Sequence, residues 1–209
     1  MNPQQQPRAR HLKRLLDIGA AALLLWLTLP LQALITLAIR VSMGGPILFR
    51  QERLGLSEQI VTVWKFRTMT NDPSIPDDQR LTRLGTWLRK TSLDELPQLL
   101  NIMCGEMSFV GPRPLLVRYG PFYRDGERRR HSVIPGLTGW AQIHGRNHLS
   151  WDRRLTLDAW YVDNWSLRLD AAILLRTLLY VLRRQGVETA PSAAMDDLDV
   201  ERAEALRSV

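Results

Sequence analysis

The chain has 209 residues, and its 28 lysine and arginine side chains outnumber 21 acidic ones, giving a formal net charge of +7. A hydrophobic fraction of 45% is enough for a packed core, and the length fits one compact domain beyond a hydrophobic segment. The single cysteine, Cys104, excludes an internal disulfide framework and agrees with a reducing compartment.

The positive charge lies ahead of an acidic tail. Residues 187–209 contain six acids against two arginines, which leaves residues 1–186 near +11. Such a body attracts anionic lipid headgroups and phosphate ligands, although a compositional bias toward arginine is an alternative explanation. A nucleic-acid binder is a rival interpretation, but no named binding motif is present, so we expect no nucleic-acid partner.

Residues 18–39 form an uncharged run that would be about 33 Å long as a helix, enough to cross a hydrocarbon core. Basic residues flank it on both sides, so the positive-inside rule marks both ends as cytoplasmic. Pro30 lies near its middle and disrupts helical hydrogen bonding. The run is either a re-entrant helix that bends at Pro30 and returns to the same face, or a kinked single span. It begins too late for a typical signal peptide, so we interpret it as a retained anchor.

The rest of the chain alternates extended and helical segments separated by glycine and proline. We expect the tail from Thr189 onward to be disordered or a short helix. The last long helix is basic and amphipathic, and it can lie in a membrane interface or pack in the core. The predicted extended segments are 46–53 and 59–68, and the predicted helices are 81–90, 92–103, 151–162 and 167–184.

The strongest candidate for chemistry is the pair Asp94 and Glu95. Ser92 followed three residues later by Glu95 is typical of a capping box, which predicts both acids in the first turn of a helix, where the dipole favours negative charge. Pro97 would strain a helix that starts at Ser92, so Asp94 is an alternative cap. Acids in a first turn are also ordinary helix chemistry, and this structural interpretation stays open.

Basic residues accompany this pair. Arg89 precedes it, and the loop 111–114 holds Arg113 between Pro112 and Pro114, so that the guanidinium is presented with little entropy to lose. Guanidinium groups match phosphate oxygens bidentately. Mg²⁺ binds through one or two carboxylates plus substrate phosphates, and an aspartate can act as a nucleophile. Two further cations can reach phosphate or lie on a solvated strand face: Lys65 and Arg67. Two acids are expected to form structural ion pairs with arginines: Asp158 and Asp170.

Six segments carry a resemblance that covers about residues 12–186. They read KRLLD (13–17), GPILFRQERLG (45–55), KFRTM (65–69), SLDELPQLLNIMCGEMSFVGPRPLL (92–116), PGLTGWAQIHGRN (135–147) and LSWDRRLTLDAWYVDNWSLRLD (149–170). The sequence resembles the small monotopic phosphoglycosyl transferases of the bacterial sugar transferase family. Several long motifs in the same order make this resemblance far more specific than one short pattern.

The resemblance implies transfer of a sugar 1-phosphate from a UDP-sugar to a polyprenyl phosphate, such as undecaprenyl phosphate, with release of UMP. It implies that Asp94 forms a covalent phosphosugar intermediate and that Glu95 is linked to Mg²⁺. Arg89 would lie near the substrate phosphates and Arg113 in the nucleotide-binding loop. It also implies a re-entrant helix with its hinge at Pro30. Many family members have serine before that proline, whereas this chain has Leu29, for which Thr28 is a candidate substitute.

We therefore expect an α+β, mostly helical fold at the cytoplasmic face of the bacterial inner membrane. Its parts are a basic segment with the re-entrant helix–break–helix (1–43), a small cytosolic catalytic domain with interfacial amphipathic helices (44–186) and a disordered acidic tail (187–209). Membrane lipid is an expected partner, and downstream glycosyltransferases are candidate partners. The alternative function is a non-catalytic membrane-tethered scaffold of a glycan assembly complex.

Overall fold

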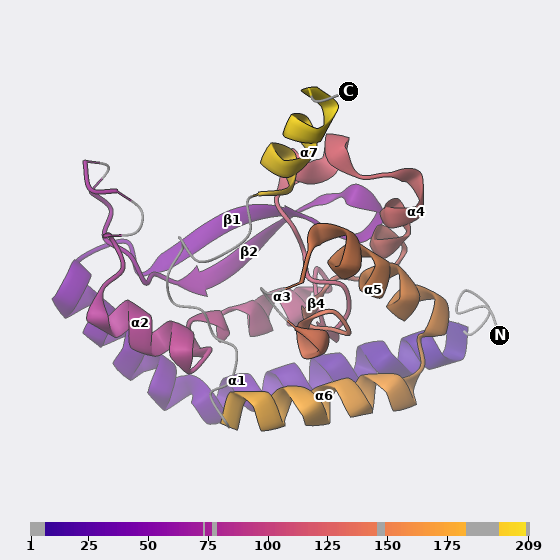
Figure 1. Ribbon diagram of the computed structural model, residues 1–209. Coiled ribbons are helices and arrows are strands. Elements are labelled where there is room, and N and C mark those ends of the chain that lie inside the picture. The colour runs from indigo at the N-terminus through magenta and orange to yellow at the C-terminus, as the bar shows by residue number, and fades with distance from the viewer. Residues whose placement is uncertain (1–6, 73, 77–78, 146–148, 183–196, 208–209) are drawn as a thin grey trace.

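The computed structural model describes residues 7–72, 74–76, 79–145, 149–182 and 197–207. They form a mostly helical α+β fold with two sheets of two strands each. In Figure 1 the long N-terminal helix runs along the lower side of the molecule, the β1–β2 hairpin lies above it, and shorter helices cover the remaining side.

The α-helices are α1 Pro7–Met43, α2 Arg83–Lys90, α3 Gln98–Cys104, α4 Asp125–Arg128, α5 Trp151–Asn164, α6 Leu167–Leu182 and α7 Leu198–Arg207, and the strands are β1 Leu48–Leu54, β2 Ile60–Phe66, β3 Ser108–Val110 and β4 Gly136–Thr138. Short 3-10 turns lie at Leu56–Glu58, Leu93–Glu95, Val117–Phe122, Arg129–Ser132 and Gln142–His144.

The helix α1 continues without interruption through Pro30, so the expected helix–break–helix is not present as two separate helices. Figure 1 shows α1 as bent rather than straight. Thr28 Oγ1 donates a hydrogen bond to the Leu24 carbonyl at 2.6 Å and accepts one from Gln32 Nε2 at 3.0 Å. A hydroxyl bonded back to the carbonyl four residues earlier bends a helix, as proline does. Thr28 and Pro30 therefore place two causes of bending within one turn.

One side of α1 packs on the domain and the rest is exposed. Ala21, Ile35 and Ile39 are at most 3% exposed. In the most apolar stretch of α1, only 11% of the residues are buried, and the helix is long and apolar enough to cross a membrane. This surface is that of a membrane-associated helix rather than of a core helix. The exposed large apolar residues between 18 and 41 are Leu23, Leu24, Trp26, Leu27, Leu29, Leu34, Leu37 and Val41.

The hairpin β1–β2 confirms the two predicted extended segments. Its strands are antiparallel, with Leu48 opposite Phe66 and Leu54 opposite Ile60. Side chains alternate between the two faces of a strand, and directly opposite residues share a face. The register therefore places Arg53 on the same face of the hairpin as Lys65.

The strands β3 and β4 are parallel and hold the loop that follows β3. Ser108 lies opposite Gly136, and Val110 lies opposite Thr138. A Cβ at Gly136 would lie 2.1 Å from the Gly111 nitrogen, so only glycine permits this close approach. The backbone of the loop 111–114 is thereby pressed against β4.

The helix α6 has a packed side and an exposed apolar side. Ile173 is fully buried, whereas Leu175 is 61% exposed. Asp170 accepts a hydrogen bond from Lys13 Nζ at 2.6 Å, which pins α6 to α1. Packing in the core is confirmed for one side, and the exposed apolar side leaves the membrane interface as a prediction. Arg183 and Arg184, which were expected to extend this helix, lie outside the described residues.

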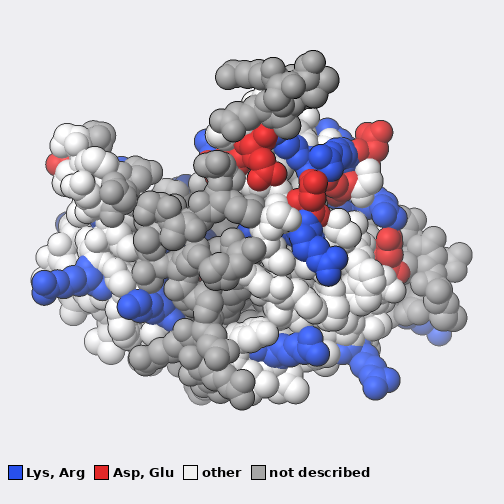
Figure 2. All heavy atoms as spheres, in the orientation of Figure 1, with Lys and Arg blue, Asp and Glu red and all other residues white. Residues whose placement is uncertain are grey.

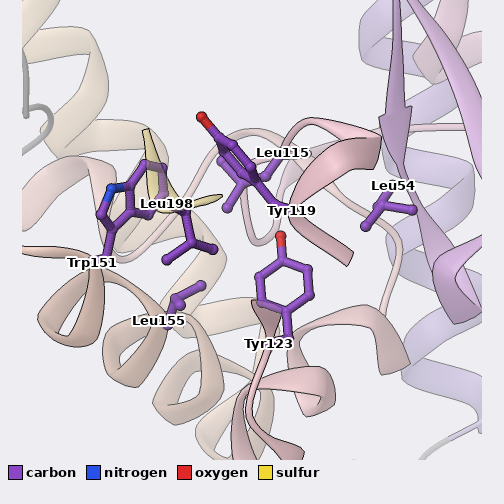
Figure 3. Packing of buried hydrophobic residues seen from close by; sticks show 7 residues of the cluster. All are labelled: Leu54, Leu115, Tyr119, Tyr123, Trp151, Leu155 and Leu198. Carbon is purple, nitrogen blue, oxygen red and sulfur yellow. The ribbon is translucent and has the colours of Figure 1, made fainter. Parts of the chain in front are cut away.

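The acidic tail was expected to be disordered or a short helix, and the part that the structure describes forms the short helix α7. The helix α7 brings Leu198 into a cluster beside Trp151 and Leu155 (Figure 3), and Leu198 is fully buried. Arg202 Nη1 donates to Glu127 Oε2 at 2.7 Å, and Arg202 Nη2 donates to Asp152 Oδ1 at 2.9 Å. The ion pairs of Arg202 with acids of α4 and α5, together with the buried side chain of Leu198, thus hold this helix. Residues 187–196 lie outside the described residues.

Charge is unevenly spread over the face shown in Figure 2. Near α4 and α7, in the upper part of the view, acidic and basic side chains are mixed. Along the lower part, where α1 and α6 lie, the charged side chains drawn in colour are basic. The side of the molecule formed by α1 and α6, which carries their exposed apolar residues, is therefore bordered by positive charge, as expected beside anionic lipid headgroups.

Candidate active site

The paired acids lie in the 3-10 turn Leu93–Glu95, between α2 and α3. Ser92 has a left-handed backbone with φ of 55°, and its side chain makes no capping hydrogen bond. The α-helix begins only at Gln98, with Pro97 as its cap. The predicted capping box is therefore wrong, and so is the alternative of Asp94 as the cap. Pro97 is the physical reason, because proline fits the start of a helix but not its interior.

Glu95 is held by two cations. Lys65 Nζ donates to Glu95 Oε1 at 2.6 Å, and Arg113 Nη2 donates to the same oxygen at 2.5 Å. Burial by itself would raise the pKa of Glu95, but the charges of Arg113 and Lys65 outweigh it and hold that pKa far below its usual range. Glu95 is therefore ionised at any physiological pH. Cations from distant segments, rather than a helix terminus, stabilise its charge.

Asp94 is only 8% exposed, and within the described part of the chain its carboxylate has no hydrogen-bond or ion-pair partner. Burial and then the charge of Glu95 raise its pKa to about 6, against the opposing charges of Lys65, Arg113 and Arg89. At pH 7 the carboxylate is thus mostly ionised. No close contact would have to be broken before it attacks an electrophile, which is what a nucleophile requires.

The loop 111–114 presents Arg113 to this turn, as the sequence predicts. Pro112 and Pro114 are both buried. The Arg113 carbonyl accepts a hydrogen bond from Arg130 Nη2 at 2.6 Å, and Arg130 is paired with Asp158 at 2.9 Å. The side chains of that pair are 1% and 3% exposed. A buried ion pair therefore fixes the backbone that carries Arg113.

The structural ion pairs expected of the two acids are both present, with one difference. Asp158 pairs with an arginine, as predicted, whereas the partner of Asp170 is Lys13. The contribution of Arg130 to the site was missed, because nothing in its local sequence separates it from its basic neighbours Arg128 and Arg129.

The other predicted phosphate-binding cations divide between two places. Arg89 lies close enough to Asp94 for their charges to interact, and its Nε donates to Thr68 Oγ1 at 3.1 Å. Burial lowers the pKa of Arg89. Arg67 does not join the acids, because its guanidinium donates to the carbonyls of Gly45 at 2.8 Å and Met43 at 2.6 Å and so ties down the end of α1. Pro30 is exposed on α1 and is not part of the group.

Two polar residues, Arg53 and Gln98, join the site without having been singled out in the sequence. A small cavity of about 20 Å³ is lined by Arg53, Val63, Lys65, Gln98, Arg113 and Pro114, and so includes the two cations that hold Glu95. Burial, and then the charge of Arg113, lower the pKa of Arg53 to about 10. Strand alternation could have indicated Arg53, since it shares a hairpin face with Lys65, but only after the register was known.

The carboxylate oxygens of the site suit a hard metal ion that takes few protein ligands. No cluster of three or more histidine, cysteine, aspartate or glutamate side chains occurs among the described residues. Both cationic contacts to Glu95 use Oε1, and none to Oε2 occurs within the described ranges. A carboxylate oxygen on Glu95 and the uncommitted carboxylate of Asp94 fit Mg²⁺, which binds through one or two carboxylates and substrate phosphates.

Comparison with known proteins shows which family the chain resembles. The family described as bacterial sugar transferase matches residues 8–184. The uncharacterized sugar transferase EpsL of Bacillus subtilis is 48% identical, over 85% of this chain and 90% of its own length. The UDP-glucose:undecaprenyl-phosphate glucose-1-phosphate transferase of Escherichia coli is 42% identical, over 81% of this chain and 40% of its own length. The undecaprenyl-phosphate galactose phosphotransferase of Salmonella typhimurium is 38% identical, over 85% of this chain and 42% of its own length. The chain thus spans less than half the length of these last two relatives.

Proposed function

The chain belongs to the bacterial sugar transferase family, and from that premise we propose that it transfers a sugar 1-phosphate from a UDP-sugar to undecaprenyl phosphate, releasing UMP. One observation carries the proposal. Asp94 has a buried, ionisable carboxylate that no described residue bonds to, and it lies beside an acid that two cations hold. This combination supports a nucleophilic role for Asp94 among groups able to bind phosphate.

We propose that the reaction runs through a covalent intermediate on Asp94. A carboxylate oxygen of Asp94 forms a bond to the β-phosphorus of the UDP-sugar. The bond from that phosphorus to the bridging oxygen breaks, and its electron pair leaves with UMP. An oxygen of the lipid phosphate then attacks the same phosphorus and displaces the Asp94 carboxylate, which gives the polyprenyl diphosphate sugar. Because the steps are separate, the water-soluble and lipid substrates need not occupy the site together.

The surrounding cations would bind and orient the diphosphate. Arg113 has a planar guanidinium suited to bidentate contact with phosphate. Its side chain is 39% exposed, so a ligand can reach it from solvent. Lys65 and Arg89 supply further positive charge on two sides of the acids. Charge that develops on the leaving phosphate would meet donors already in place, which is the most effective form of electrostatic catalysis.

Mg²⁺ is the proposed cofactor, with Glu95 as its principal protein ligand. When bound, the ion would act as a Lewis acid on the diphosphate and add to the positive charge that the surrounding cations supply. Glu95 suits this role because its carboxyl stays ionised and one of its oxygens is already oriented by Lys65 and Arg113.

We further propose that α1 is re-entrant, so that the site faces the cytoplasm at the inner membrane. The bend in α1 and the basic residues at both of its ends support this placement. The exposed leucines of α6, beside α1 in Figure 1, would extend the apolar surface in contact with lipid.

Cysteine labelling tests the topology. With Cys104 replaced by serine, single cysteines introduced at Gln5 and at Gln59 should both react from the cytoplasmic side with a membrane-impermeant maleimide. Labelling of the two positions from opposite sides of the membrane would show that α1 spans the bilayer and would overturn the re-entrant proposal.

The proposed activity is tested directly by measuring UMP release. The purified full chain, supplied with Mg²⁺ and undecaprenyl phosphate, should release UMP from at least one member of a panel of UDP-sugars, and EDTA should stop the release. Lack of turnover with every donor, in protein that remains folded and membrane-bound, would favour the scaffold alternative.

A further inference from the structure

Gln98 is a buried amide whose Nε2 donor finds no acceptor among the residues that the structure describes. Its side chain is 2% exposed, and with the amide oriented as in the structure its Nε2 has no hydrogen-bond partner among the described residues. A buried donor without an acceptor costs about 1–3 kcal/mol. Native proteins retain such groups where a ligand or an ordered water provides the acceptor.

A second buried amide on the same helix shows what a structural role requires. Asn101 is 3% exposed, and its Nδ2 donates to the Thr62 carbonyl at 2.7 Å and to Glu106 Oε2 at 2.6 Å. Its Oδ1 accepts from the Trp64 nitrogen at 3.3 Å. Asn101 therefore joins α3 to β2 with every amide group in use. Gln98, one turn earlier, has a donor without such a contact.

The surroundings of Gln98 indicate which ligand supplies the acceptor. It lines the cavity of about 20 Å³ together with Arg53, Lys65 and Arg113. With Arg89, four cations act on the two acids of the site, so positive charge exceeds negative charge by two or more. An anion with several acceptor oxygens balances this excess, and a phosphoryl group is such an anion.

We infer that Gln98 is a substrate-contacting residue, whose Nε2 donates a hydrogen bond to a phosphoryl oxygen bound at the cavity that Gln98 lines with Lys65 and Arg113. The inference rests on the proposed function and extends it to a residue that no motif or relative assigns. The phosphoryl oxygen belongs to the diphosphate of the donor or to the phosphate of the lipid acceptor.

Gln98→Met tests the contact, because methionine has a similar volume and no donor. We expect kcat/KM for UMP release to fall about 10- to 100-fold, the effect of losing one hydrogen bond to a charged group. We expect the apparent Tm to stay the same or rise, since an unpaired buried donor has been removed. Loss of stability without loss of turnover per folded molecule would assign Gln98 a structural role and overturn the inference.

The matched control is Asn101→Leu. It should lower the apparent Tm while turnover per folded molecule is maintained, because Asn101 joins two elements and does not line the cavity. If both variants changed stability and turnover in the same way, the assignment of Gln98 to substrate would fail.

Ligand binding separates this inference from the proposed reaction. UDP or inorganic pyrophosphate, each with Mg²⁺, should raise the apparent Tm of the wild-type chain more than that of Gln98→Met. This difference supports the contact even if no UMP release is found. Equal shifts, or no shift in either protein, exclude the donor diphosphate as the group that Gln98 contacts, and the inference then falls unless the lipid phosphate shows the contact in the sulfur experiment.

Sulfur substitution identifies the source of the phosphoryl oxygen. Three substrates carry sulfur in turn at the β-phosphate of the donor, at its α-phosphate and at the lipid phosphate. Sulfur is a poor hydrogen-bond acceptor. At the phosphate that Gln98 contacts, sulfur substitution should therefore lower kcat/KM less in Gln98→Met than in the wild-type chain. Penalties that are identical in both proteins at all three positions would overturn the inference.

Discussion

Replacement of Asp94 by asparagine should reduce UMP release by roughly 10³-fold or more, the scale seen when a covalent nucleophile is removed. Asparagine preserves the shape of the side chain, but its amide is a far weaker nucleophile than the carboxylate and cannot form the phosphosugar intermediate. The variant should still fold and sediment with membranes, because no described residue bonds to the Asp94 carboxylate. Incubation with a UDP-sugar labelled in the sugar should leave a covalent adduct on the wild-type chain alone. Full turnover by Asp94→Asn would exclude Asp94 as the nucleophile.

The pH profile supplies a second measurement of the same residue. Burial and the charge of Glu95 raise the pKa of Asp94 to about 6, so the reactive ionised form is lost as the pH falls through that value. Wild-type kcat/KM should therefore drop about tenfold per pH unit below pH 6. Glu95 should add no step in this range, since Arg113 and Lys65 hold its pKa far lower. A flat profile between pH 5 and 7 would contradict the assignment of Asp94.

The largest effect on stability should come from Asp158→Asn, which should cost about 3–5 kcal/mol. The change leaves the size of the side chain almost intact but removes the charge that compensates Arg130, whose side chain is 1% exposed. For a chain of this size the loss corresponds to a fall of about 6–20 °C in Tm. Thermal unfolding in detergent or nanodiscs measures it. An unchanged Tm would mean that the pair does not stabilise the fold.

A double variant separates the stabilising role of this pair from its positioning role. Arg130→Met combined with Asp158→Leu replaces both charges by apolar side chains and should recover most of the lost stability. UMP release by the double variant should nevertheless be slower than that of the wild-type chain, because the Arg113 carbonyl loses the donor that fixes its loop. Recovery of both stability and turnover would show that Arg130 does not position Arg113.

Local patterns predicted the hairpin and the long helices, but not the short parallel pair β3–β4 and not the boundary that matters most. The extended segments around 46–53 and 59–68 became the hairpin, and the helices from Trp151 and from Leu167 begin where expected. The Ser92–Glu95 spacing favoured a capping box, yet Pro97 delays the α-helix until Gln98 and leaves the acids in a 3-10 turn. Two local signals conflicted there, and the backbone restriction of proline prevailed over a side-chain cap.

Neighbours in sequence also separated in space. Lys65 and Arg67 are two residues apart and were expected to share one role. The strand β2 ends at Phe66, after which the guanidinium of Arg67 meets the carbonyls at the end of α1. Lys65 remains on the hairpin face that carries Arg53 and reaches Glu95. Only the register and the packing of α1 against the hairpin distinguish the two.

The sequence by itself determined the apolar helix, the order of the elements, the family and the pair of acids, because hydrophobic periodicity and motif spacing are local properties. Tertiary structure decided which charges meet that pair. Lys65 and Arg113 reach Glu95 across 30 and 18 residues. Arg130 fixes the Arg113 loop across 17 residues, and its own partner Asp158 lies 28 residues further along the chain. The pKa of Asp94 depends on burial and on these charges together, so it is a property of the folded chain and of no segment alone.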